Sequence, residues 1–255
     1  MALRVNKMAP TAMPLPSRAV GRPTIRWKDG GGRVRAAVAD RGAAGLAMHN
    51  AMHARYPVKY QGRQNYQGYY WFAALENHVW YESMNEFSSL MLLDHLGGIV
   101  AVASQPMIMN FSDGTWHYPD YFALHADGTQ VVYDVKAEKD IDDKVAAQFE
   151  KSARFCERCG WGYEVLHGVR GVPGWNLEWI AAYRHNRYSP DAELLNSILG
   201  RLDDRTTLGE LARTVGMGRR FLRIHNIYNA MWRRHIAFDE TTPLDWSSKV
   251  WKAEK

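Results

Sequence analysis

The sequence is poor in cysteine. It contains two among 255 residues, Cys156 and Cys159, in the stretch "FCERCGW". A structural zinc site usually needs a second pair of ligands, and no such pair lies at suitable spacing. A redox-active Cys-x-x-Cys pair would need a thioredoxin-like context, which the chain does not show. Because helical periodicity continues through both residues, we expect them to be half-buried residues of a helix.

Long apolar runs are also missing. No stretch of about 18 apolar residues occurs, so the sequence predicts no transmembrane helix. The first 20 residues lack the continuous apolar segment of a secretory signal. Hydrophobic residues nevertheless make up 46% of the chain, which is ample for a packed core and argues against global disorder. We therefore expect a soluble, cytoplasmic protein.

Acidic residues are scarce in two segments, although the formal net charge is only +5. Residues 1–35 contain eight Lys or Arg and one acid, and residues 201–234 contain eight Arg and three acids. Basic segments attract polyanions, and phosphate contacts dominate nucleic-acid affinity. Each patch alone is equally consistent with a solvated surface. Together with the motifs below, the two patches favour nucleic acid as the partner.

Three parts of the chain differ in composition. Residues 1–40 are rich in Pro, Gly and Arg ("GRPTIRWKDGGGRVR") and predict a basic, poorly ordered arm. Residues 41–185 alternate between helical and strand-like segments, which predicts an α/β or α+β core whose middle strands are covered by helices. Residues 186–255 change character and predict a helical C-terminal module.

The middle part contains recognisable helix and strand signals. Two aromatic-rich segments flank Glu76-Asn77 and predict a hairpin, although aromatics beside basic residues can also stack on bases. Ser83 and Glu86 have capping-box spacing, so a helix should begin there and end at Gly97-Gly98, with one face formed by Met84, Phe87, Leu90 and Met91. An apolar strand interrupted at Gln105-Pro106, an amphipathic helix closed by Gly160, and a further strand ("WGYEVLHGV") are also expected.

The C-terminal module has the spacing of a helix-turn-helix. Thr207 and Glu210 form a second capping box, Gly216 lies in a turn, and an Arg-rich helix is expected to follow. The segment "HIAFDETTPLDW" is a candidate wing. Such a helix pair is as often a packing or partner module as a DNA reader, so the candidate DNA- or partner-binding residues are Arg219, Arg220 and Arg223.

The stretch "HYPDYFALHADGTQVVYDVKAEKD" holds the candidate chemistry. If Ala126, Asp127 and Gly128 form a three-residue loop, Asp120 lies directly opposite Asp134 on one face of a hairpin. Lys136, two residues further along, lies on the same face. A two-residue loop would instead place Asp120 opposite Val135, on the other face. Because directly opposed carboxylates repel, the first arrangement predicts a cation between them.

Such a cation suits phosphodiester hydrolysis. Mg²⁺ held by carboxylates stabilises charge on the phosphate oxygens and makes a water nucleophilic at neutral pH. A lysine beside the ion can orient or deprotonate that water and offset developing charge. A third carboxylate commonly comes from a preceding helix. Glu86 is the candidate, and Glu82, one turn earlier on the same face, is a second.

A Pro-Asp that opens one strand, followed by an apolar strand ending in Asp-Val-Lys after a helix with Glu, is the pattern of the PD-(D/E)xK nuclease superfamily. The segments "WYESMNEFSSLMLLDHLGGIVAVASQP", "HYPDYFALHADGTQVVYDVKAEKD" and "GWGYEVLHG" resemble, more narrowly, the core of TnsA-type transposon endonucleases. The tail from residue 208 resembles that family's C-terminal module through Met231-Trp232, Ile236, Asp239, Pro243-Leu244, Ser247 and Val250. The resemblance covers roughly residues 56–252 and leaves out the basic arm.

The resemblance implies a restriction-endonuclease-like core with a winged-helix-like module. It implies a Mg²⁺-dependent DNA endonuclease, with Mn²⁺ as a substitute, that cuts the non-transferred strand at the 5′ ends of the element. Its partners would be the double-stranded transposon ends, a DDE-type transposase and an AAA+ regulator, in the bacterial cytoplasm beside the nucleoid. Glu86, Asp120 and Asp134 would be metal ligands and Lys136 the catalytic lysine.

Three alternatives stay open at the level of sequence. Gln105 would be an active-site neighbour, but a strand-edge polar residue before a proline is an equally good interpretation. The same core is compatible with a stand-alone restriction or repair nuclease. It is also compatible with a DNA-binding scaffold subunit that has lost cleavage, although all four chemical positions hold competent residues.

Overall fold

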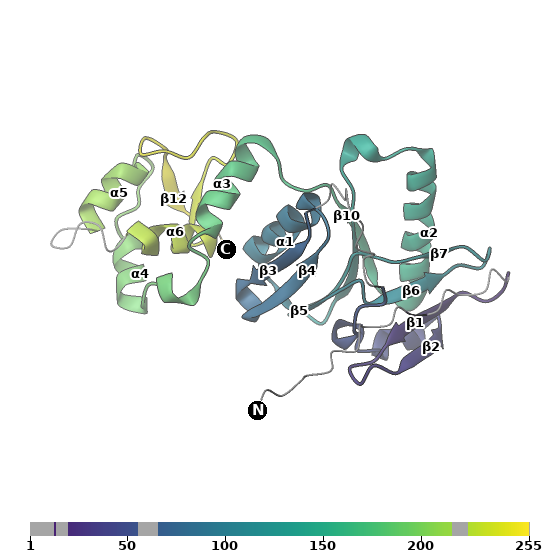
Figure 1. The fold of residues 1–255 in the computed structure, drawn as a ribbon. Helices are drawn as coiled ribbons and strands as arrows, with labels where there is room; N and C mark the ends of the chain where they lie inside the picture. Colours follow the sequence, from purple (N-terminus) through teal and green to yellow (C-terminus); the bar gives the residue numbers. More distant parts are fainter. Residues whose placement is uncertain (1–12, 14–19, 56–65, 216–223, 255) are drawn as a thin grey trace, which may run out of the picture. The chain divides into compact units, whose positions relative to one another are not determined.

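The computed structural model describes residues 13, 20–55, 66–215 and 224–254. The fold is mixed α/β, with several sheets and helices (Figure 1), as the sequence predicts at this coarse level. The chain divides into two compact units. Unit 1 consists of Met1–Gln67 and Ile99–Leu166, and unit 2 of Gly68–Gly98 and His167–Lys255. The segment expected to form one α/β domain, residues 41–185, therefore contributes to both units.

The central sheet of unit 1 has four strands in the order β10-β9-β8-β5. These are β5 (Ile99–Ser104), β8 (Tyr121–His125), β9 (Gln130–Val135) and β10 (Gly162–Leu166). The β5–β8 and β8–β9 pairs are antiparallel, and β9–β10 is parallel. A parallel pair needs a crossover connection. The amphipathic helix α2 (Asp143–Cys159) provides it, with Asp142 as N-cap and Gly160 in a left-handed conformation at its end (Figure 1).

A second sheet of unit 1 has the order β2-β1-β6-β7. Its strands are β1 (Thr24–Lys28), β2 (Val34–Val38), β6 (Met107–Asn110) and the short β7 (Trp116–His117). The expectation of a poorly ordered arm over residues 1–40 is therefore wrong for residues 24–38. They form an antiparallel hairpin, and β1 also pairs with β6, which is distant in sequence.

The main core of unit 1 joins both sheets to α2. Ile25 of β1, Met107 of β6 and Phe122 of β8 pack in one buried cluster with residues of α2. Cys156 and Cys159 belong to this cluster and are fully buried, so the sequence placed them correctly in a helix but underestimated their burial. Burial raises the pKa of the Cys159 thiol to about 12. Both thiols are structural residues of the core.

The first part of unit 2 is the predicted hairpin followed by the predicted helix. The hairpin consists of β3 (Gly68–Phe72) and β4 (Asn77–Tyr81), joined through the 3-10 turn η3 (Ala73–Leu75). Helix α1 (Met84–Leu96) begins after Ser83 and ends at Gly97. Buried Asp94 of α1 accepts hydrogen bonds from the Tyr70 hydroxyl and from the Ala73 and Ala74 amides, which fixes the hairpin to the helix. Met84 is 50% exposed and is not part of the buried face.

The rest of unit 2 consists of helices and a small sheet. The elements are α3 (Gly171–Ala181), α4 (Ala192–Leu199), α5 (Leu208–Val215), α6 (Ile224–Trp232), and the paired strands β11 (Ile236–Phe238) and β12 (Val250–Lys252). The capping box before α5 is confirmed, because the Glu210 amide donates to the Thr207 hydroxyl and the Thr207 amide donates to the Glu210 carboxylate. None of the helices among the described residues is long and apolar enough to cross a membrane.

Helix α6 lies where the second helix of the helix-turn-helix was expected, and its burial agrees with the packing alternative. Residues 226–232 of α6 are all buried, so this part of the helix is a core element and does not present an exposed reading face. The candidate binding residues Arg219, Arg220 and Arg223 lie outside the described residues. Where a wing was expected, β11 and β12 form a two-stranded sheet.

Candidate functional site

The β8–β9 hairpin has a three-residue loop, Ala126, Asp127 and Gly128, which is the loop length that places Asp120 opposite Asp134. The His125 amide donates to the Thr129 carbonyl (2.8 Å), and Gly128 has φ +86°, in the left-handed region that favours glycine. The register pairs Tyr121 with Tyr133, so the preceding residue, Asp120, lies across from Asp134. Of the two loop lengths considered from sequence, the three-residue loop is the one observed, and it places the two aspartates directly opposite each other.

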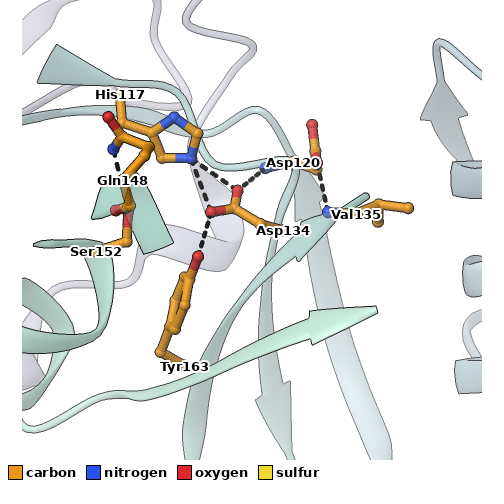
Figure 2. Close-up of polar contacts among 7 residues, drawn as sticks. All are labelled: His117, Asp120, Asp134, Val135, Gln148, Ser152 and Tyr163. Atoms are coloured by element: carbon orange, nitrogen blue, oxygen red, sulfur yellow. Dashed lines mark hydrogen bonds and ion pairs between the residues drawn. The ribbon is translucent and has the colours of Figure 1, made fainter. Parts of the chain in front are cut away.

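The two aspartates also bond to the backbone of each other's strand (Figure 2). The Asp120 amide donates to Asp134 Oδ1 over 3.4 Å, and Asp120 Oδ2 accepts from the Val135 amide at 2.7 Å. Asp134 is only 2% exposed. These bonds continue the hairpin beyond its last regular pair and fix both carboxyl groups on rigid strands.

Two side chains that the sequence did not single out contact Asp134. His117, from β7, places its Nε2 atom 2.8 Å from each carboxylate oxygen. Tyr163, from β10, donates its hydroxyl to Asp134 Oδ2 at 2.6 Å. Burial, together with the neighbouring Asp134 charge, raises the pKa of Tyr163 well above its usual range. Tyr163 therefore stays a neutral hydrogen-bond donor at physiological pH.

Asp120, Asp134 and Lys136 line one pocket within unit 1, with a volume of about 430 Å³. His117 and the start of α2, including Lys144 and Gln148, complete its wall. Three acidic side chains, two lysines and one histidine thus face one cavity beside the end of β9. Such a convergence of titratable groups is typical of a functional site.

Glu82 and Glu86 lie in unit 2, at the start of α1. Helix α1 begins at Met84, so Glu82 precedes it and is not one turn earlier on its face, as the sequence suggested. Glu86 accepts hydrogen bonds from the Glu82 amide (2.8 Å) and from the Ser83 hydroxyl (2.9 Å). The predicted capping box is therefore confirmed, and the Glu86 carboxylate has this structural role whatever else it does.

Gln105 touches the site through its backbone. Its amide donates to the Asp120 carbonyl (2.7 Å), while its buried side chain accepts from Arg55 (3.3 Å). Its φ of +45° is rare for a residue other than glycine. The side chain is not among those that line the pocket. Gln105 thus supports the strand end on which Asp120 lies.

The residues missed by sequence reasoning left weak signals. His117 stands three residues before Asp120, in a two-residue strand that no periodicity reveals. Tyr163 was assigned to a strand, but only the parallel register, which pairs it with Val132, places it on the Asp134 side of the sheet. Both contacts depend on tertiary structure.

The donor set of the pocket is compatible with a divalent cation. Carboxylate oxygens are the ligands that Mg²⁺ prefers, and an imidazole suits transition metals. Among the described residues, no group of three His, Cys, Asp or Glu side chains already has the arrangement of a metal centre. The fit therefore concerns the kind of donor present: the pocket is lined by His117 and by three carboxylates, of which Asp142 already caps α2.

Comparison with known proteins adds no family assignment. The chain matches no protein-family model and no curated protein. The functional interpretation of the pocket therefore depends on its own residues.

Proposed function

We propose that the chain is a Mg²⁺-dependent DNA endonuclease subunit of a heteromeric transposase. It would hydrolyse phosphodiesters of the non-transferred strand at the 5′ ends of the element, beside a DDE-type transposase and under an AAA+ regulator. The core would be restriction-endonuclease-like, and the C-terminal part would be a winged-helix-like module. The family resemblance of the sequence motivates the transposon setting.

One observation carries the enzymatic part of this proposal. The two aspartates face each other on adjacent strands, and both line the same pocket as Lys136. Like charges directly across a sheet are destabilising, and the backbone bonds that the two carboxylates accept leave both charges in place. A cation that binds both of them removes this cost. The arrangement therefore supports a metal site more than a structural role.

Each residue then has a distinct task. Asp120 and Asp134 would hold the ion, and Mg²⁺ bound there would supply charge stabilisation and water activation. Lys136 contributes a positive charge on the pocket wall, which can orient the attacking water or offset charge on a phosphate oxygen. Tyr163 keeps Asp134 in one orientation through its hydroxyl. The rigid strands on which these groups lie favour catalysis, because little reorganisation is needed.

Glu86 is proposed as the third carboxylate on the basis of the resemblance. Its capping role complicates a test, because Glu86→Ala removes the cap and the candidate ligand together. Glu86→Gln retains a side-chain oxygen that accepts a hydrogen bond and removes the charge. Cleavage lost in Glu86→Gln, with the helix content unchanged by circular dichroism, supports a role beyond capping.

The decisive experiment is cleavage of a duplex that carries an end of the element, with Mg²⁺ and with or without the transposase. We expect Asp120→Ala and Lys136→Ala each to lower the cleavage rate by at least about 100-fold. The matched control is Asp127→Asn, because Asp127 lies in the same hairpin but outside the pocket, and asparagine can still accept from the Thr129 amide. Wild-type cleavage by either pocket variant would contradict the proposed site.

The same assay separates the alternative functions. Efficient Mg²⁺-dependent cleavage of duplexes without transposon ends, in the absence of any transposase, would favour a stand-alone nuclease. Specific end binding with no cleavage under any condition would favour a scaffold subunit.

A further inference from the structure

The imidazole of His117 contacts both carboxylate oxygens of Asp134 through one nitrogen atom. Its Nε2 atom is 2.8 Å from Oδ1 and 2.8 Å from Oδ2 (Figure 2). Equal distances place the nitrogen in the plane that bisects the line between the two carboxylate oxygens. An ordinary side-chain pair needs only one of these contacts. The symmetric approach brings the imidazole nitrogen and both oxygens into one small region of the pocket wall.

The spacing of these donors suits a common ion. Adjacent ligands of an octahedral ion at 2.0–2.1 Å lie about 3 Å from each other. The observed 2.8 Å between Nε2 and each oxygen is close to this value, so a turn of the imidazole that aims Nε2 beside the carboxylate lets both groups bind one ion. A neutral imidazole can carry its proton on Nδ1, which leaves the Nε2 lone pair for the ion.

The positions of both donors are fixed by the fold. The His117 backbone pairs with Met109 of β6, and Asp134 lies one residue before the end of β9, a central strand of the other sheet. The hydroxyl of Tyr163 holds Oδ2 from a third strand. The His117 side chain is 22% exposed and lines the pocket, whereas the Asp134 side chain is 3% exposed. The imidazole therefore lies on the open side of a buried carboxylate.

We infer that His117 is a ligand, through Nε2, of the same divalent ion that Asp134 binds. This inference rests on the proposed function and extends it, because it predicts which cations the site prefers. Mg²⁺ selects oxygen donors, whereas imidazole nitrogen favours Co²⁺ and other transition-metal ions. The site consequently accepts Mg²⁺ but binds Co²⁺ more tightly than a site built from oxygens alone.

The test uses the full chain with the metal alone and no DNA. Mn²⁺ replaces Mg²⁺, and electron spin-echo measurements record whether a nitrogen nucleus is coupled to the ion. We expect this coupling in the wild-type protein and its absence in His117→Ala. Calorimetric titration should show that His117→Ala lowers Co²⁺ affinity by at least about tenfold and Mg²⁺ affinity much less. His125→Ala is the control, because His125 lies in the β8–β9 hairpin that carries Asp134 but bonds to Tyr133 and does not line the pocket.

The outcomes separate this inference from the proposed function. Binding of Mn²⁺ that is lost in Asp134→Asn but shows no nitrogen coupling would refute the role of His117 alone. Nitrogen coupling that persists in His117→Ala would also refute it. Binding that does not depend on Asp120 or Asp134, or no binding at all, would refute both the ligand role and the proposed metal site.

Discussion

Removing the Tyr163 hydroxyl should weaken unit 1 more than removing a similar hydroxyl nearby. Tyr163→Phe deletes the 2.6 Å bond to Asp134 and leaves the ring in place. A hydrogen bond to a charged group contributes about 1.5–3 kcal/mol, and Asp134 is too buried for water to replace the donor fully. The comparison is Tyr133→Phe. It deletes a 3.0 Å bond to His125, a neutral contact that contributes about 0.5–1.5 kcal/mol.

Native-state hydrogen exchange of the β8, β9 and β10 amides measures this difference. A loss of 1.5–3 kcal/mol accelerates exchange through opening of unit 1 by about 13- to 160-fold, whereas the control should give about 2- to 13-fold. Tyrosine ionisation does not complicate the measurement, because burial raises the pKa of both hydroxyls above their usual range. If Tyr163→Phe accelerates exchange no more than Tyr133→Phe, the hydroxyl of Tyr163 does not stabilise the buried Asp134 carboxylate.

Two further predictions concern the frame around the site. Burial lowers the pKa of His95 in α1 to about 4 from 6.5, so the unfolded chain binds a proton between these values that the folded unit does not. Unit 2 should therefore keep full stability above pH 6.5 and lose up to about 3 kcal/mol as the pH falls to 4. In His95→Gln, the free energy of opening measured by hydrogen exchange should depend less on pH over this range. An unchanged pH dependence would contradict the role of His95. In unit 1, Gly128→Ala should cost about 1–2 kcal/mol, because alanine is strained at φ +86° although no atom lies within 4 Å of the new Cβ. Urea denaturation should show a smaller loss for Gly128→Asn, and equal losses for both variants would rule out backbone strain as the cause.

Local rules of sequence predicted the parts of the structure that depend on neighbouring residues. The loop before Thr129, the capping boxes at Ser83 and Thr207, and the helix end at Gly160 involve groups a few residues apart. Strand parity then placed Asp120 opposite Asp134, because a three-residue loop determines the register of the whole hairpin. Sequence therefore reduced this half of the candidate site to two alternatives, and the observed loop of three residues decides between them.

Tertiary pairing explains what sequence could not supply. The segment 24–38 has the Gly, Pro and Arg content of an arm, yet alternating Ile25 and Trp27 find partners on β6, about 80 residues later. His117 reaches Asp134 because two sheets meet beside the pocket, and Tyr163 does so across a parallel pair. The sequence left open whether the helix at α6 packs or reads DNA, and its burial depends on the other elements of unit 2. In each case the deciding contact joins residues that no local pattern links.

The discontinuous make-up of unit 2 has a consequence for biosynthesis. Its hairpin and α1, Gly68–Gly98, leave the ribosome before the helices with which they share a unit, which begin after His167. At about 5–20 residues per second, translating the rest of the chain takes roughly 8–30 s. During this interval Leu90, Met91 and Leu93, all buried in the finished unit, have no complete core to join. Nascent chains arrested between residues 98 and 167 should therefore be the ones that general chaperones bind most strongly.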